Sequence, residues 1–306
     1  ADKIEIPMIA SGGFADARGL VAALALGADG INMGTRFCVT KEAPIPDAFK
    51  EQMVANDERQ TDLIFRTMHN TATLTLAPST ASIAALHEHG VQRVHMWRRG
   101  VDTARFRPEL RDHAWRERVG GGRRLVGYVG RLAPEKELHR LAELAQLPGT
   151  RLVLVGEGPS RNELGARLAE AVSTSPGRPN LPPAFLGPRT GEDLARAYAT
   201  FDVFVHTGTK ETFGQTLQEA AAAGLPVVAP AVGGPLDLVD HGRSGYLFAP
   251  DVRGDLARWV AELVDSPALR ESMGDHGPAM VADRSWSSLT EQLVGHYEAA
   301  ASAHAA

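Results

Sequence analysis

The stretch FVHTGTKETFGQTLQEAAAAGLPVVAP, residues 204–230, decides the fold of this chain. It begins with an apolar run that ends at His206, passes through a Gly-containing turn, becomes helical near Phe213 and finishes in a second apolar run. A strand, a helix and a strand in succession predict two parallel strands joined by a crossover helix. Because strands buried on both faces appear as short continuous apolar runs, the stretch predicts part of a doubly wound parallel sheet.

The same alternation continues on both sides of this stretch. Short apolar runs recur as RLVGYVG (124–130), RLVLVG (151–156), PAFLG (183–187), DVFVH (202–206), PVVA (226–229) and GYLF (245–248). Helical segments separate them, and in the first of these the apolar side chains fall on one face: Leu138, Leu141, Ala142 and Ala145. Residues 123–283 are therefore predicted to form an α/β domain with a Rossmann-like parallel sheet.

Two glutamates in the opening stretch carry the chemistry. Glu211 precedes the predicted helix, and Glu219 lies two turns inside it. The first N–H groups of a helix lack internal partners and attract anions, so a diphosphate could bind there. The residues of this predicted cradle are Phe213, Gly214, Gln215, Thr216 and Leu217. Glu219 could accept two ribose hydroxyls and Glu211 could hold sugar hydroxyls, whereas His206 is expected to be a buried strand-end residue without a role.

The spacing of the two glutamates, within ETFGQTLQEAAAAGLPVVAP, resembles the family-4 retaining glycosyltransferases of GT-B fold. GYVGRLAPEKEL (127–138), VGEGP (155–159), the glycine pair of AVGGP (231–235) and GRSGYLF (242–248) follow in that family's order. The resemblance covers about residues 71–300. Within the family, the chain is similar to bacterial GDP-mannose-dependent mannosyltransferases that act on lipid acceptors.

The resemblance implies a donor site built from several of these residues. Arg131 and Lys136 match the basic pair that neutralises the donor diphosphate, and with Glu211 they are the expected catalytic residues. An arginine fork and a lysine point charge suit a leaving diphosphate. The implied donor is a nucleotide sugar, GDP-mannose, the acceptor is a lipid or glycan, and no metal or other cofactor is expected.

The first seventy residues resemble a different family. IPMIASGGFADARGLVAALALGADGINMGTRF (6–37) and IFRTMHNTA (64–72) are similar to the closing strands of the nitronate monooxygenases, which are flavin-dependent TIM barrels. The matching flavin-phosphate positions are Gly12, Gly13, Gly34 and Thr35, as expected for the last strands of such a barrel. The pattern predicts a partial βαβα fragment.

This fragment is too short for flavin chemistry. A complete barrel needs eight strands and typically about 250 residues. The family's catalytic histidine belongs to the missing part, and His69 is the only histidine before residue 73. We therefore expect no monooxygenase activity and regard FMN binding as the weaker alternative.

The sequence thus predicts a chimera joined near residues 70–73. Its expected parts are a flavin-barrel-like fragment (1–72), a remnant of a GT-B N-terminal domain with a linker (73–122), the nucleotide-sugar-binding domain (123–283) and a C-terminal helix with a tail (284–306). The acceptor-binding domain is incomplete, and alignment of two reactants is worth roughly 7–11 kcal/mol. We therefore expect donor binding with impaired transfer; the alternatives are a flavin-phosphate-binding remnant and a structural chimera without a ligand.

Composition sets the remaining expectations. The 306 residues carry a formal net charge of -5, which does not indicate nucleic-acid binding but leaves peripheral membrane contact open. No apolar run approaches the roughly 20 residues of a membrane span, and the first residues lack the pattern of a signal peptide. Cys38 is the single cysteine, so an internal disulfide is excluded. These features predict a cytoplasmic protein, and they leave its oligomeric state open.

Overall fold

The computed structural model of the protein describes residues 9–11, 30–32, 75–174 and 180–305. The chain divides into two units, Ala1–Met68 and His69–Ala306. In the first unit, strands β1 (Ile9–Ser11) and β2 (Gly30–Asn32) pair in parallel. Both strands lie in runs that the sequence predicts as parallel strands, whereas the helices expected after each of them lie outside the described residues.

The second unit begins with a small strand–helix–strand motif. Strand β3 (Thr75–Ala77) pairs in parallel with β4 (Val94–Met96), and helix α4 (Thr80–Glu88) connects them. The Ser79 side chain caps α4 by accepting a hydrogen bond from the Ser82 N–H. The 3₁₀ turn η2 (Pro108–Leu110) and helix α5 (His113–Gly120) then lead into the main sheet.

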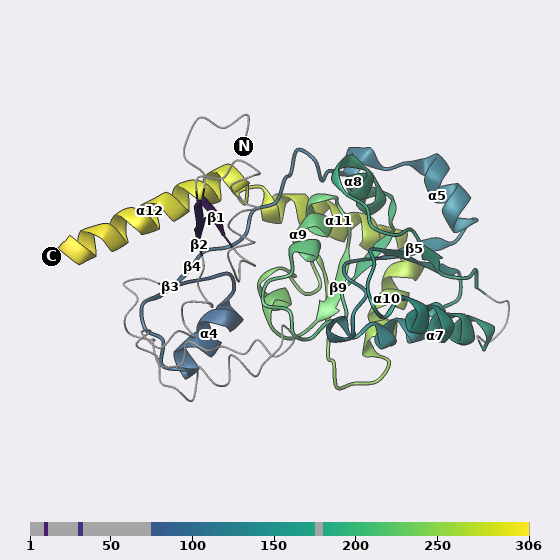
Figure 1. The fold of residues 1–306 in the computed structure, drawn as a ribbon. Helices are drawn as coiled ribbons and strands as arrows, with labels where there is room; N and C mark the ends of the chain where they lie inside the picture. The colour runs from purple at the N-terminus through teal and green to yellow at the C-terminus, as the bar shows by residue number, and fades with distance from the viewer. Residues whose placement is uncertain (1–8, 12–29, 33–74, 175–179, 306) are drawn as a thin grey trace. The chain divides into compact units, whose positions relative to one another are not determined.

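The main sheet has six parallel strands in the order β10-β9-β8-β5-β6-β7 (Figure 1). Its strands are β5 (Arg124–Val129), β6 (Thr150–Val155), β7 (Ala184–Phe185), β8 (Val203–Val205), β9 (Val227–Pro230) and β10 (Gly245–Phe248). All six coincide with the predicted apolar runs, with β6 beginning one residue before its run and β9 ending one residue after, and this confirms the Rossmann-like α/β class. The chain builds outward from β5 to β7 and then returns to build outward from β8, so the topological switch lies between β5 and β8.

Helices cover both faces of this sheet (Figure 1). Side chains of α8 (Gly191–Thr200) and α9 (Gln215–Ala222) pack into one apolar cluster, and those of α6 (Leu141–Ala145), α7 (Arg161–Ser173) and α10 (Asp255–Asp265) pack into the other. Helix α11 (Pro267–Val281) and helix α12 (Trp286–Ala305) complete the chain. The 3₁₀ turn η5 (Gly234–Asp237) follows β9.

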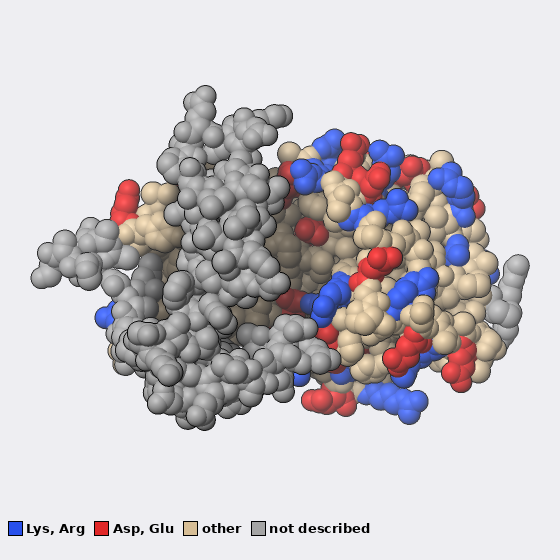
Figure 2. All heavy atoms as spheres, in the orientation of Figure 1, with Lys and Arg blue, Asp and Glu red and all other residues tan. Residues whose placement is uncertain are grey.

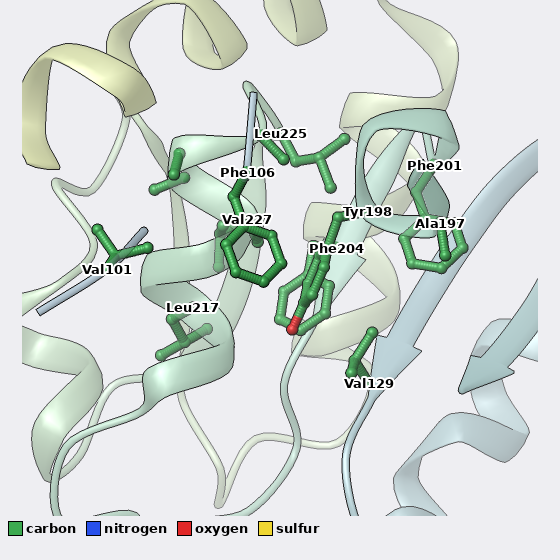
Figure 3. Close-up of a cluster of buried hydrophobic side chains, with 14 of the residues drawn as sticks. Val101, Phe106, Val129, Ala197, Tyr198, Phe201, Phe204, Leu217, Leu225 and Val227 are labelled. Atoms are coloured by element: carbon green, nitrogen blue, oxygen red, sulfur yellow. The ribbon is translucent and has the colours of Figure 1, made fainter. Parts of the chain in front are cut away.

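The strands divide their side chains between two apolar clusters. Along β8, Val203 and Val205 enter one cluster, and Phe204 enters the other. In the second of these, Tyr198 lies against Phe204 and Phe106, with ring centroids 5.4 Å and 5.6 Å apart (Figure 3). Successive side chains of a strand point to opposite faces of the sheet, and here both faces are buried. The sequence therefore shows continuous rather than alternating apolar runs.

Asp202 immediately precedes β8 and bonds to the neighbouring strand β5 and to two arginines that lie before β5 in the sequence. Its carboxylate accepts a hydrogen bond of 2.8 Å from the Leu125 N–H of β5. It also forms ion pairs of 2.8 Å with Arg111 and Arg116. Burial raises the pKa of Asp202, but the Arg116 hydrogen bond and the two arginine charges outweigh burial, so this pKa lies below its ordinary value. The network fixes β5 beside β8 at the topological switch.

Two helical segments differ from the sequence-based expectation. The segment after β5 is not one continuous helix: it forms the 3₁₀ turns η3 (Pro134–Lys136) and η4 (Leu138–Arg140) before α6, because Glu137 between them adopts a left-handed φ of 50°. The predicted C-terminal helix buries its apolar side chains only in part. Leu289 is 3% exposed, whereas Trp286 and Tyr297 are 49% and 62% exposed.

Candidate functional site

The candidate site lies at the carboxyl ends of β5 and β8. These strands are neighbours in register, with Val126 opposite Val203 and Gly127 opposite Phe204. The loop after β5 carries the predicted basic pair, and the loop after β8 carries the first predicted glutamate. Because strand order reverses here, the two loops diverge above the sheet, which is where open α/β sheets bind ligands.

Lys136 and Glu211 meet directly. The Lys136 Nζ lies 3.0 Å from the Glu211 Oε2, and both side chains are mostly buried, at 29% and 19% exposure. Burial acts to raise the pKa of Glu211, but the hydrogen bond and charge of Lys136 outweigh it, so this pKa lies below its ordinary value. Glu211 is therefore a carboxylate at neutral pH, paired with a cation 75 residues away in sequence.

His206 lies beside this ion pair. Its Nε2 is 3.6 Å from the Glu211 Oε2, and the side chain is only 3% exposed. Neither ring nitrogen forms a hydrogen bond of good geometry with any described residue, although the Gly208 backbone lies near enough to act to raise the pKa of the ring. Burial lowers the pKa of His206 to about 4; Glu211 acts in the opposite direction and Lys136 in the same direction. The ring is therefore neutral at pH 7.

The two loops are tied together by side chains that the sequence analysis assigned no role. Thr207 donates its hydroxyl to the Lys136 carbonyl at 2.6 Å. The Glu137 carboxylate accepts hydrogen bonds from the hydroxyl of Thr209 and from the Arg140 Nε. These bonds hold Glu137 in its left-handed conformation, which is uncommon for a residue with a Cβ. They also fix Lys136, the preceding residue, against the loop of Glu211.

Two consecutive glycines pack their backbone against the loop that carries Glu211. The Gly234 N–H donates to the Glu211 carbonyl at 2.8 Å. A Cβ on Gly233 would lie 2.6 Å from that carbonyl oxygen, and a Cβ on Gly234 would lie 2.3 Å from the Phe213 carbonyl oxygen. Only glycine permits so close an approach of two backbones, which explains the pair within AVGGP.

Helix α9 begins later than expected and offers fewer donors. It starts at Gln215, after Gly214 with a left-handed φ of 102°. The Leu217 N–H already donates to the Gly214 carbonyl at 3.0 Å, so it is not available to a ligand. The cradle of residues 213–217 stays a prediction, and its free N–H groups lie before Leu217. Within the described residues, the N–H groups of Gly214, Gln215 and Thr216 have no hydrogen-bond acceptor.

Glu219 lies on α9, one turn beyond these groups. Its Oε2 accepts a hydrogen bond of 2.9 Å from the hydroxyl of Tyr198, which is fully buried. Burial raises the pKa of Glu219 despite the lowering effect of this hydrogen bond. Glu219 lines a cavity of about 350 Å³ whose other walls include Thr190, Gly191, Leu194 and Gln215. The carboxylate is thus held at an open cavity by the buried phenol of Tyr198, a residue to which the sequence analysis assigned no role.

Arg131 is more exposed than Lys136, and its ionic partner lies on its own loop. Its side chain is 65% exposed, and its guanidinium bonds Glu135, four residues along the same loop. The structure thus brings Lys136 and Glu211 into contact and places Arg131 on the same loop with an acidic partner of its own. The flavin-phosphate positions Gly12, Gly13, Gly34 and Thr35 lie outside the described residues.

Wider surface features add little to this site. On the face seen in Figure 2, the basic and acidic side chains of the described residues are interspersed rather than separated by sign. Among these residues we find no group of three or more histidine, cysteine, aspartate or glutamate side chains arranged to hold a metal. No helix in the described part of the chain is long and apolar enough to cross a bilayer.

Comparison with known families identifies the second unit. Residues 111–280 match the family model for glycosyl transferases group 1. The chain belongs to the group 1 glycosyl transferases. Residues 1–86 match the model for nitronate monooxygenase, which supports the second resemblance seen in the sequence. The nitronate monooxygenase match extends past residue 72 and includes β3 and most of α4.

Individual relatives agree with this assignment. The chain is 45% identical over 237 residues to a GDP-mannose-dependent alpha-mannosyltransferase of Mycobacterium tuberculosis, covering 77% of this chain and 59% of that protein. It is 32% identical over 240 residues to the sulfoquinovosyl transferase SQD2 of Arabidopsis thaliana, covering 75% and 45%. This group 1 chain therefore spans less than two thirds of the length of either relative.

Solved structures share the fold. Anabaena Alr3699/HepE, solved with UDP and glucose, superposes with a TM-score of 0.68 at 22% identity, covering 95% of this chain and 77% of that one. Sucrose-phosphate synthase from Thermosynechococcus elongatus gives a TM-score of 0.70 at 25% identity, covering 84% and 66%. These similarities place the group 1 chain in the GT-B fold.

Proposed function

We propose that this chain binds a nucleotide-sugar donor, GDP-mannose, at the carboxyl ends of β5 and β8. The observation that carries the proposal is the Lys136–Glu211 ion pair at the topological switch, 3.0 Å long and mostly buried. A cation for the diphosphate and a carboxylate for the sugar stand side by side there. The names of three relatives, each described as GDP-mannose-dependent, support the choice of donor.

Each residue has a distinct part in this proposal. Lys136 and Arg131 neutralise the diphosphate, which accumulates negative charge as the glycosidic bond breaks. The N–H groups at the start of α9 add donors to the phosphate oxygens. Glu219 accepts the ribose hydroxyls inside its cavity, and Glu211 accepts hydroxyls of the sugar. By family, transfer would retain the anomeric configuration, with the acceptor a lipid or glycan.

Binding requires both cations to change partners. In the structure, Lys136 is paired with Glu211 and Arg131 with Glu135. A diphosphate carries more charge than either carboxylate and can accept from both side chains at once, so it competes favourably for them. The exposed Arg131–Glu135 pair contributes little and exchanges readily. The Lys136–Glu211 pair is more buried and dominates the cost of exchange.

We further propose that transfer is impaired. Residues 1–86 match the model of a different family, nitronate monooxygenase, and are not expected to form the acceptor-binding surface of a group 1 glycosyl transferase. Holding donor and acceptor in line is worth roughly 7–11 kcal/mol of barrier, or several powers of ten in rate. Cytoplasmic location stays a prediction from the sequence, based on the single Cys38.

Isothermal calorimetry tests donor binding. GDP-mannose, GDP and UDP-glucose are titrated into the purified chain, and circular dichroism shows that it is folded. We expect GDP-mannose and GDP to bind and UDP-glucose to bind more weakly. If no nucleotide binds to the folded protein, the proposed function is wrong. Release of GDP from GDP-mannose with and without lipid acceptors measures the remaining transferase and hydrolase activity.

A flavin-phosphate site is the second candidate, and the match of residues 1–86 to nitronate monooxygenase favours it. Its expected mark is a yellow preparation, or one that gains flavin absorbance after incubation with FMN and gel filtration. A colourless protein that retains no FMN would exclude this candidate and leave the donor site untouched.

A further inference from the structure

We propose that His206 is a positioning residue that takes over Glu211 when the donor diphosphate draws Lys136 away. The inference rests on the proposed donor site, and it gives a role to a histidine that the sequence analysis left without one. The first step is that two nitrogen atoms lie near the same carboxylate oxygen of Glu211. The Lys136 Nζ and the His206 Nε2 both face the Glu211 Oε2, at 3.0 Å and 3.6 Å.

The second step is the unused hydrogen-bonding capacity of the imidazole. Both ring nitrogens are buried, and neither has a hydrogen-bond partner among the described residues. Burying a polar group without a partner costs free energy, and such exceptions often mark functional positions. Movement of Glu211 by less than 1 Å would bring its Oε2 within hydrogen-bond distance of the Nε2, as roughly 3.2 Å is the outer limit for N–H···O bonds.

The third step is the competition for Lys136. One ammonium group cannot remain fully paired with Glu211 while it neutralises a diphosphate. When Lys136 moves, Glu211 loses its cation while it remains mostly buried, and an unpaired buried carboxylate is costly. An imidazole Nε2–H beside it supplies a replacement donor. Because this ring is neutral at pH 7, it does not compete with Lys136 for the diphosphate.

The exchange has a consequence for the sugar. With Lys136 on the diphosphate and His206 on one oxygen, Glu211 keeps its orientation, and its other oxygen is available to a sugar hydroxyl. Without the histidine, the carboxylate would lose its anchor at the moment the donor binds. His206 therefore affects binding of the sugar more than binding of the nucleoside diphosphate.

Calorimetry on a leucine and a glutamine variant separates this role from simple packing. For each protein the measured quantity is the ratio of the GDP dissociation constant to the GDP-mannose dissociation constant. In His206→Leu we expect this ratio to fall about tenfold, the worth of one hydrogen bond to a charged group. In His206→Gln, whose amide can replace the Nε2–H, we expect most of the ratio to return. Val205→Ala, the preceding buried residue of β8, is the packing control and should keep the wild-type ratio.

Nuclear magnetic resonance of the ¹⁵N-histidine-labelled wild-type chain gives a second reading that does not depend on whether the leucine variant folds. We expect the His206 Nε2 resonance to shift when GDP is added, as the new hydrogen bond forms. In Lys136→Met, the shifted position should be present before any nucleotide is added, because the lysine that pairs with Glu211 is then absent.

Several results would overturn the inference. An unchanged ratio in His206→Leu, equal weakening of GDP and GDP-mannose, or a His206 resonance that GDP does not move would each reject it while donor binding stands. A wild-type chain that binds GDP and GDP-mannose equally would also reject it, because Glu211 would then contribute nothing to the sugar. If the wild-type chain binds neither ligand, the proposed function fails and the inference fails with it.

Discussion

Replacing Glu219 by glutamine should weaken nucleotide binding and stabilise the unliganded protein. Alanine is a poor choice at this position, because it would leave the buried Tyr198 hydroxyl without the acceptor that now lies 2.9 Å away. Glutamine keeps an oxygen for that hydroxyl and removes only the charge. The comparison therefore isolates what the carboxylate contributes to the ligand from what it contributes to the fold.

The magnitude for binding follows from the two expected ribose hydrogen bonds. Hydrogen bonds to a charged acceptor contribute about 1.5–3 kcal/mol and neutral ones about 0.5–1.5, so each bond loses about 1 kcal/mol. Two bonds together correspond to a dissociation constant about thirtyfold higher. Calorimetry with GDP measures this directly. An affinity within twofold of wild type would show that Glu219 does not bind the ribose.

The effect on stability has a defined pH dependence. Burial raises the pKa of Glu219 in the folded state above its value in the unfolded state. The contribution of Glu219 to the free energy of unfolding is therefore fully present below its unfolded-state pKa, and it is lost as the pH rises through the folded-state pKa. Wild type has lost it at pH 7, so Glu219→Gln should be more stable there by about 0.5–1 kcal/mol, with no gain at pH 4. Urea unfolding at both pH values measures the difference. Glu143→Gln is the matched control, since burial also raises the pKa of Glu143; it should gain stability at pH 7 with unchanged GDP affinity.

Three further predictions concern other residues of the second unit. Arg131→Ala should weaken GDP binding about tenfold while the melting temperature changes by about 1 °C or less, because its surface pair with Glu135 contributes little; a binding constant equal to wild type would place the diphosphate elsewhere. His206 has a folded pKa of about 4 against an ordinary 6.5, so its contribution to stability is full above pH 6.5 and is lost as the pH falls through 4, by up to about 3 kcal/mol. His206→Gln should remove that loss in urea titrations across this range, and an identical acid profile would contradict it. Asp202→Asn should destabilise the fold by about 3 kcal/mol, because it leaves two arginines without their buried partner, and a urea midpoint at the wild-type value would show that the network is not structural.

The sequence predicted the sheet well because the relevant signals are local. Each strand buried on both faces leaves a continuous apolar run, and each of the six runs became a strand. The glycine pair at Gly233 and Gly234 was noted only through the family resemblance, and the close backbone contacts that require glycine there became visible in the structure. The helix after β5 was less predictable, because its apolar stripe persists although Glu137 interrupts the backbone. A left-handed glutamate leaves no mark in the pattern; the bonds to Thr209 and Arg140 that hold it come from tertiary structure.

The contacts that make the site were not readable from the pattern. Lys136 and Glu211 are separated by 75 residues, and their pairing depends on β5 lying next to β8, an order that hydrophobic periodicity does not encode. Tyr198 was not predicted for the same reason, because its hydroxyl reaches Glu219 from α8, the helix that precedes α9. His206 was visible as a polar residue closing an apolar strand inside the most informative stretch. A strand-end histidine is usually a packed core residue, so only its two unpaired nitrogens beside Glu211 distinguish it.

The residues of the proposed donor site lie within one domain, and this determines which part of the chain donor binding depends on. Lys136, Glu211, Glu219 and the start of α9 all belong to a sheet domain whose elements are supported by one another. Supports from outside the sheet come from both sides of it in sequence. The Gln215 amide donates to the Gly100 carbonyl, and the Gln218 amide to the Arg99 carbonyl. The Ser82 hydroxyl of α4 donates to the Thr212 carbonyl beside Glu211, and the Arg284 guanidinium donates to the Gln218 side chain. The residues proposed to bind the donor, Lys136, Glu211 and Glu219, all lie in the second unit. Removing the first unit, Ala1–Met68, should accordingly change transfer, which needs an acceptor surface, far more than it changes the affinity for the donor.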